Sequence, residues 1–236
     1  MGAPAVALAP GVYRIPTFGD FINSYAFLDD DGQVTLVDCG LARAPAKIVA
    51  ALAFMGKQPA DVTRILLTHA HSDHAGGAHA MVEASGAAGV GVHSADVEFT
   101  RAGHNAPPDL STASGRLFTR VPGTTFRSVA VAEELADGQL LPVAGGLRVH
   151  HSPGHSPGHV SLVHEPTGVL ITGDAIFNVL ARIRWPLAVI CTSFALNKRS
   201  AHLLGELDYS VAAFTHGPEI RDRPREAIRD FLRRKG

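Results

Sequence analysis

Histidine and aspartate side chains gather just after an apolar run in the first third of the chain. His69, His71, Asp73 and His74 fall within six positions and directly follow Ile65–Leu67. Alternate side chains of an extended strand point the same way, so His69 and His71 project together if the strand continues through them. Imidazole and carboxylate groups are common ligands of zinc and iron. The cluster therefore indicates a metal site at the end of a buried strand, in preference to four exposed polar residues on a loop.

Three further places put ligand-type residues at a strand end or in a rigid turn. His155 lies in the turn 152–159, whose prolines and glycines fix its shape. Asp174 directly follows the apolar strand expected at 169–172, where a buried carboxylate needs a cation or several donors. His216 follows another apolar run. Each of these alone has an ordinary interpretation as a loop or turn residue, but together with the cluster they indicate one shared site.

Other candidate residues receive a structural interpretation. We expect His79 and His93 to be partly buried helix and strand residues and not ligands. His104 lies in an irregular segment from which it could reach a substrate. The basic residues from Arg221 to Lys235 are interleaved with acids, a pattern typical of a solvated helix face more than of a nucleic-acid contact.

Composition limits the classes of partner. The 236 residues are 46% hydrophobic and 18% charged, with a formal net charge of −1, which gives no reason to expect nucleic acid or an anionic membrane as partner. Cys39 and Cys191 are too few for a disulfide framework, so we expect a reduced, cytoplasmic setting. The apolar start, residues 1–10, lacks the basic region of a signal peptide. The apolar run 187–196 is too short to cross a bilayer.

Strand and helix patterns alternate at both ends of the chain, with short strands between them. Strands are expected at 12–28 (one or two), 34–37, 65–68, 90–93, 129–134, 140–143, 147–151, 161–164, 169–172 and 211–214. Helices are expected at 45–55, 78–84, 195–207 and 223–234. The strands from 129 to 151 are expected to form a meander, and the Pro- and Gly-rich segment 94–128 is expected to be a lid over the site. With no linker evident, 1–236 is expected to be a single mixed α/β layered domain.

The ligand-type residues and their spacing resemble the metallo-β-lactamase superfamily, over a stretch that runs from about Val12 to Gly217. The matching motifs are His69-x-His71-x-Asp73-His74, Pro153-Gly154-His155, Gly173-Asp174 and Thr215-His216-Gly217, with Asn23-Ser24-Tyr25 and Val37-Asp38-Cys39-Gly40 in the N-terminal strands. The resemblance implies an α/β fold, a four-layer αββα sandwich, with the metals at one edge between its two sheets.

Carried over residue by residue, the resemblance implies a site for two divalent metal ions. The ligands implied for the first metal are His69, His71 and His155, those for the second are Asp73, His74 and His216, and the bridging ligand is Asp174. His159 would lie outside the ligand set, and Asp38 would orient a ligand histidine. Zinc is the expected metal, with iron or manganese as the alternatives.

The resemblance also implies a metal-bound hydroxide as the nucleophile, so that no serine or cysteine nucleophile is needed. Two divalent cations bring about +4, and two carboxylates and a hydroxide remove about three, which leaves a charge of about +1 to stabilise an oxyanion. Asp73 would orient the hydroxide or accept its proton. Asp174 together with His74 resembles the hydrolase branches, glyoxalase II thioesterases and lactonases, whereas the lactamases lack a matching aspartate. We therefore expect a metallo-hydrolase of a small-molecule ester, thioester or lactone.

Two other functions stay open. Persulfide dioxygenases resemble the same superfamily but use one iron, whose ligands would match His71 or His69, together with His155 and Asp174. A metal-binding regulatory or scaffold protein without turnover is the third interpretation. The residues available for a second metal, among them His216, favour the hydrolase. The sequence leaves the substrate and the oligomeric state open.

Overall fold

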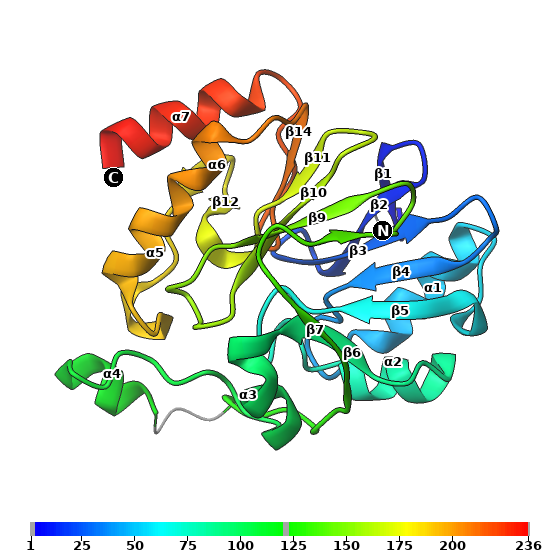
Figure 1. The fold of residues 1–236 in the computed structure, drawn as a ribbon, viewed down its shortest axis with the longest axis horizontal. Coiled ribbons are helices and arrows are strands. Elements are labelled where there is room, and N and C mark those ends of the chain that lie inside the picture. Colours follow the sequence, from blue (N-terminus) through cyan, green and yellow to red (C-terminus); the bar gives the residue numbers. More distant parts are fainter. Residues whose placement is uncertain (1–2, 120–122, 236) are drawn as a thin grey trace.

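Two β-sheets lie face to face, with helices on the outer face of each (Figure 1). The computed structural model describes residues 3–119 and 123–235. The first sheet has seven strands whose order in space is their order in the chain: β1 (Val6–Ala9), β2 (Val12–Phe18), β3 (Ile22–Leu28), β4 (Val34–Val37), β5 (Val62–Leu66), β6 (Val90–His93) and β7 (Val131–Leu135). β1 to β4 pair antiparallel, and β4 to β7 pair parallel.

The second sheet is built from the later part of the chain. Its five strands lie in the order β14 (Val211–Ala213), β11 (Val169–Ile171), β10 (Val160–His164), β9 (Leu147–His151) and β8 (Leu140–Leu141). Neighbouring strands pair antiparallel except β11 and β14, which are parallel. A separate small hairpin consists of β12 (Phe177–Val179) and β13 (Arg182–Arg184).

Helices connect the strands and cover the sheets. They are α1 (Pro45–Phe54), α2 (Ala78–Ser85), α3 (Val97–Ala102), α4 (Ala113–Phe118), α5 (Phe194–Ala201), α6 (Leu203–Glu206) and α7 (Pro224–Lys235). Short 3-10 turns occur at Pro59–Asp61, Ser94–Asp96, Gly173–Ala175 and Ala188–Ile190. Within the described ranges, none of the helices has both the length and the apolar composition needed to cross a membrane.

Three apolar layers separate the four layers of secondary structure. Tyr25 and Phe27 of β3 lie in the central layer between the sheets, whereas Ala26 lies in the layer formed with α1 and α2. On β11, Ile171 faces the central layer and Leu170 packs with α5, α6 and α7. Both sheets therefore bury both of their faces, as strand alternation allows. This arrangement is the predicted αββα sandwich.

The element bounds match the sequence analysis closely, with informative exceptions. β4, β6 and β9 have the expected limits. The meander expected at 129–151 is wrong at its first strand, because β7 pairs in parallel with β6 and closes the first sheet, while β8 begins the second. The turn signal at Asp137-Gly138 indicates a reversal of the chain but carries no information about the partner strand. The helix expected at 195–207 is divided at His202 into α5 and α6, with Ser193 as the expected N-cap.

The first part of the segment 94–128 is packed into the core, whereas a later part lies away from the sheets. Val97 and Thr100 of α3 are buried, and Val97 belongs to the layer that α1 and α2 cover. Further along, the amide of Ala106 donates to the carbonyl of Ala70 at 3.2 Å. α4, by contrast, lies apart from both sheets (Figure 1). The lid expected over 94–128 stays a prediction, but α3 at the start of the segment is part of the packed fold.

Candidate metal centre

The loop after β5 carries four of the seven candidate ligands. β5 ends at Leu66, so His69, His71, Asp73 and His74 lie between β5 and α2 and not on a continued strand. The loop is tightly wound, and the amide of His74 donates to the carbonyl of His71 at 3.0 Å. This turn, instead of strand alternation, brings the four side chains to one place.

The other three candidates come from the second sheet. His155 lies between β9 and β10, Asp174 in the 3-10 turn after β11, and His216 after β14. The loop of His155 closes tightly on α5: Gly154 has a φ of 130°, and a Cβ there would lie 2.1 Å from the amide nitrogen of Asn197. A residue with a side chain would be strained and would clash at this position. The glycine therefore lets His155 approach the other candidate ligands.

The seven side chains converge. Their donor atoms form three groups, each within 4.8 Å, which are His69 with His71 and His155, His69 with His74 and Asp174, and Asp73 with His74 and His216. Asp174 Oδ2 lies 3.1 Å from His155 Nε2 and 3.3 Å from His216 Nε2. Asp174 Oδ1 lies 3.3 Å from His74 Nε2. Asp174 thus stands between a three-histidine group and a group of two histidines and Asp73, while the roles of these residues as ligands stay a prediction.

The donor set fits a metal better than it fits a hydrogen-bonded core. The Nε2 atom of His69 is buried and has no hydrogen-bond partner among the described residues. His69 Nε2 is 4.0 Å from Asp174 Oδ2, beyond hydrogen-bond reach. An unpaired buried nitrogen is costly, and coordination of a cation would remove that cost. Imidazole and carboxylate donors suit zinc, and also iron or manganese.

The ring nitrogens that face away from the cluster are held by acceptors. His74 Nδ1 lies 2.8 Å from Asp38 Oδ2, so the histidine that Asp38 contacts, which the sequence analysis did not specify, is His74. His216 Nδ1 lies 2.9 Å from the carbonyl oxygen of Phe21. An acceptor at Nδ1 keeps the proton on that atom and leaves Nε2 free to bind a metal. The Phe21 contact was missed by the sequence analysis, because a backbone carbonyl carries no signal in the residue type.

His155 has a similar partner, and it is also one that the sequence analysis missed. Its Nδ1 lies 3.6 Å from Cys191 Sγ, while its Nε2 lies 3.0 Å from His71 Nδ1. His71 therefore turns Nδ1 toward the cluster, unlike the other histidines. Burial, followed by the charge of Asp174, raises the pKa of the Cys191 thiol to about 12, so this residue is a neutral neighbour of the site.

Burial and neighbouring charges shift the pKa values of the histidines in opposite directions on the two sides of the cluster. Burial, and then His155, lower the pKa of His71 to about 3, which keeps this imidazole neutral. Burial opposes the charged form of His216 as well, but Asp174 and Asp73 outweigh it and raise its pKa to about 9. On the three-histidine side His69 and His71 thus offer neutral nitrogen donors, whereas His216 on the other side is paired with carboxylates of opposite charge.

Two other histidines stay outside the donor groups, as the sequence analysis expected. The ring of His159 accepts a hydrogen bond at Nε2 from the amide of Asp174 at 2.7 Å, and its Nδ1 lies 3.0 Å from the carbonyl of Ser152. Through this hydrogen bond, His159 holds the backbone of Asp174 in place. His79 makes a separate contact, with Nδ1 2.7 Å from the carbonyl of Ser128.

A pocket of about 380 Å³ opens beside the donor groups. His71 and Asp73 line one part of it, Pro107 and Ile190 give it apolar surface, and His104 lines it as well. Its volume is that of a small-molecule site. The side chain of Asp73 is 31% exposed, whereas the histidines of the donor groups are nearly fully buried. A molecule in this pocket would therefore meet Asp73 first.

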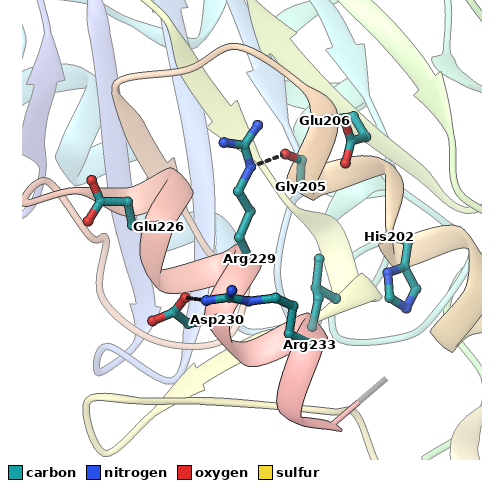
Figure 2. Close-up of a pocket in the computed structure, with 8 residues that line it drawn as sticks. His202, Gly205, Glu206, Glu226, Arg229, Asp230 and Arg233 are labelled. Atoms are coloured by element: carbon teal, nitrogen blue, oxygen red, sulfur yellow. Dashed lines mark hydrogen bonds and ion pairs between the residues drawn. The ribbon is translucent and has the colours of Figure 1, made fainter.

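A second groove, of about 530 Å³, lies between α6 and α7 (Figure 2). Arg229 Nε donates to the carbonyl of Gly205 at 2.6 Å, and Arg233 is paired with Asp230. None of its lining residues belongs to the three donor groups. Both arginines therefore have partners within the two helices, and the groove is a polar junction between α6 and α7.

Comparison with known proteins gives consistent matches over most of the chain. The family model described as the metallo-beta-lactamase superfamily matches residues 18–216, a range that includes all seven candidate ligands. The probable metallo-hydrolase YybB of Bacillus subtilis is 29% identical over 195 residues, which cover 82% of this chain and 80% of YybB. A hydroxyacylglutathione hydrolase of Cereibacter sphaeroides is 34% identical over 158 residues, 65% of this chain but 48% of that protein. The solved structure of a metallo-beta-lactamase family protein from Thermus thermophilus is similar with a TM-score of 0.75 and 30% identity, covering 97% of this chain and 80% of that one.

Proposed function

The chain belongs to the metallo-beta-lactamase superfamily, and from this membership and its donor set we propose that it is a hydrolase with two metal ions, zinc foremost, that acts on an ester, thioester or lactone. The observation that carries the proposal is the convergence of seven donors, with six of them in two groups of three and Asp174 between these groups. A single metal held by the three histidines would leave the second group, which contains His74 and His216, without a cation.

The proposed ligand sets follow the two groups. The first metal would be held by His69, His71 and His155, the second by Asp73, His74 and His216, and both by Asp174. When bound, such ions polarise a substrate carbonyl and lower the pKa of water. The site therefore needs no nucleophilic side chain, and the buried, neutral Cys191 is not proposed as one.

Asp73 is the proposed acceptor of the proton of the attacking water. Its Oδ2 lies 3.3 Å from His216 Nε2, and its side chain lines the pocket. Burial alone would raise the pKa of Asp73, but His74 and His216 outweigh burial and hold this pKa below its usual value. The carboxylate is therefore ionised at neutral pH, and its Oδ2 is the atom proposed to accept or orient the proton of the water.

The proposed substrate is a small molecule bound in the pocket beside Asp73. The hydroxyacylglutathione hydrolase among the relatives supports a thioester as one candidate bond. The chain spans only 48% of that protein, so the glutathione part of its substrate is not carried over. The cytoplasmic setting and the absence of nucleic-acid partners stay predictions from composition.

Metal analysis and a substrate panel test the proposal. We expect the purified protein to bind two zinc ions per chain and to hydrolyse at least one class among esters, thioesters and lactones without oxygen. The variant His216→Ala should bind one ion and lose activity by about two orders of magnitude or more. His104→Ala, which changes the pocket but none of the donors, is the matched control and should keep both ions. Oxygen consumption with a persulfide by the iron-loaded protein, unaffected by His216→Ala, would contradict the proposal.

A further inference from the structure

Asp96 is a buried carboxylate near the metal centre that belongs to none of the three donor groups. It ends the 3-10 turn Ser94–Asp96, which directly follows β6, and it is fully buried. A buried carboxylate must be satisfied by a cation or by hydrogen-bond donors. The donors around Asp96 therefore show what this residue holds in place.

Three donors from two different loops meet on this carboxylate. Oδ2 accepts hydrogen bonds from the amide of Ala70 at 2.9 Å and from the hydroxyl of Ser156 at 2.6 Å. Oδ1 accepts a hydrogen bond from the amide of Gly158 at 2.6 Å. A Cβ on Gly158 would lie 2.7 Å from the amide nitrogen of Asp96, so this loop fits tightly against the aspartate. The contact is short, specific and shielded from water.

The donors are chain neighbours of the three-histidine group. Ala70 stands between His69 and His71, and Ser156 directly follows His155. One carboxylate thus ties the loop that carries two of these histidines to the loop that carries the third. The facing nitrogens of His71 and His155 are 3.0 Å apart, and any slip between the two loops would change that separation.

We propose that Asp96 is a positioning residue, which sets the relative placement of the two histidine loops and thereby the affinity of the three-histidine group for its metal. The inference rests on the proposed function, since it assumes that this group binds a metal. It goes beyond it in assigning a role to a residue that touches neither the metal ligands' donor atoms nor the pocket. Outer hydrogen-bond partners of this kind commonly change metal affinity by roughly 10- to 100-fold.

Asp96→Asn is an informative substitution because the two carboxylate oxygens of Asp96 each accept a hydrogen bond from a backbone amide whose position is fixed. The amides of Ala70 and Gly158 point at different oxygens of Asp96. An asparagine amide has one oxygen and one NH₂ group, so in either orientation its NH₂ group faces a backbone N–H. Asp96→Asn therefore keeps the size of the side chain but must release one of the two loops.

The matched control is Thr100→Val. The Thr100 hydroxyl donates to the backbone carbonyl of Asp96 at 2.9 Å, and its loss perturbs the same buried region without touching the carboxylate. A milder variant is Ser156→Ala, which removes one donor and leaves both backbone contacts in place. Zinc affinity at each site is measured by competition with a chromophoric chelator. The absorption spectrum of the cobalt-loaded protein reports the ligand geometry, and the thermal midpoint of chelator-treated protein reports the fold.

We expect Asp96→Asn to weaken zinc binding at one site by roughly 10- to 100-fold and to change the cobalt spectrum. Ser156→Ala should weaken it by about five-fold, and Thr100→Val should leave the affinity and spectrum unchanged. A lower thermal midpoint of Asp96→Asn with the affinity of Thr100→Val would show a structural role only and overturn the inference. If Asp96→Asn does not fold, wild-type zinc affinity in Ser156→Ala overturns it. A wild-type protein that binds no zinc would instead contradict the proposed function itself.

Discussion

The substitution Asp38→Asn tests whether Asp38 determines which ring nitrogen of His74 carries the proton. Asp38 is fully buried and has a φ of 59°, a left-handed conformation that asparagine tolerates well. Its Oδ1 accepts a hydrogen bond from the amide of Thr68, and its Oδ2 accepts one from the Thr68 hydroxyl, both at 2.8 Å. The same Oδ2 lies 2.8 Å from His74 Nδ1. With a metal bound, the carboxylate would keep the one remaining proton of His74 on Nδ1 and leave Nε2 to the second metal.

An asparagine at this position has only one workable orientation. The amide of Thr68 is a fixed donor, so the asparagine oxygen must face it and the NH₂ group must face His74. Two N–H groups cannot share a hydrogen bond, and His74 would move its proton to Nε2, the atom proposed to bind metal. The backbone and the shape of the side chain stay the same, so the effect on the fold should be small compared with the effect on the metal.

The expected magnitude follows from the lost contact. A hydrogen bond to a charged group contributes about 1.5–3 kcal/mol. At about 1.4 kcal/mol for each factor of ten, affinity for the second zinc should fall by roughly 10- to 100-fold. Chelator competition with wild-type protein and Asp38→Asn measures this directly. Asp38→Ala is the matched control: it leaves His74 free to choose its tautomer, so it should retain more zinc than Asp38→Asn but unfold at lower urea. Two zinc ions held by Asp38→Asn with wild-type affinity would refute the reasoning.

Three further predictions concern the second metal site, acid stability and the metal itself. Asn23 Nδ2 donates to the backbone carbonyls of Phe214 and Gly217, on either side of His216, at 3.0 and 2.8 Å; Asn23→Ala should therefore weaken the second zinc by about ten-fold and spare the first, as measured by chelator competition. Burial, followed by His151, lowers the pKa of His93, so the unfolded chain binds this proton better and stability should fall as pH drops below about 6.5. His93→Asn, which can keep the acceptor for the amide of Ala95, should flatten that fall between about pH 7 and pH 5 in urea unfolding, and an unchanged slope would contradict it. Zinc at a hundred times its Kd should stabilise the fold by about 2.7 kcal/mol for each occupied site, or roughly 5–10 °C per site in calorimetry, and a chelator should reverse the shift completely.

The convergence of the candidate ligands could be predicted from the sequence because each is marked by residue type next to an apolar strand. His155, Asp174 and His216 each follow or precede a strand that the sequence also predicted. The prediction of the backbone path around these residues was less accurate. β5 ends at Leu66, and the convergence of His69 and His71 depends on a loop whose turn has no simple sequence periodicity. The same limit applies to β7, since a strand pattern shows where a strand is and not which sheet it joins.

The groups that hold the donors were much harder to predict, because they are distant in sequence and ordinary in type. Phe21 acts on His216 through its carbonyl across 195 positions, and Cys191 meets His155 across 36. Asp96 lies in a segment that the sequence marked only as irregular. The type of a residue indicates that it can bind a metal. Whether its side chain is held in a binding geometry depends on contacts that form only when both sheets have packed.

The two sheets share the candidate ligands between them, four attached to the first sheet and three to the second. Direct links between the sheets near the site include the hydrogen bond from the amide of Val160 to the carbonyl of Thr68, at 2.9 Å, and the carboxylate of Asp96, which reaches both histidine loops. A metal bound by the three-histidine group would add another link of the same kind. The metal and Asp96 should therefore stabilise the same packing of the two sheets. If removal of either one already frees the histidine loops, the loss of stability on removing both should be smaller than the sum of the two separate losses.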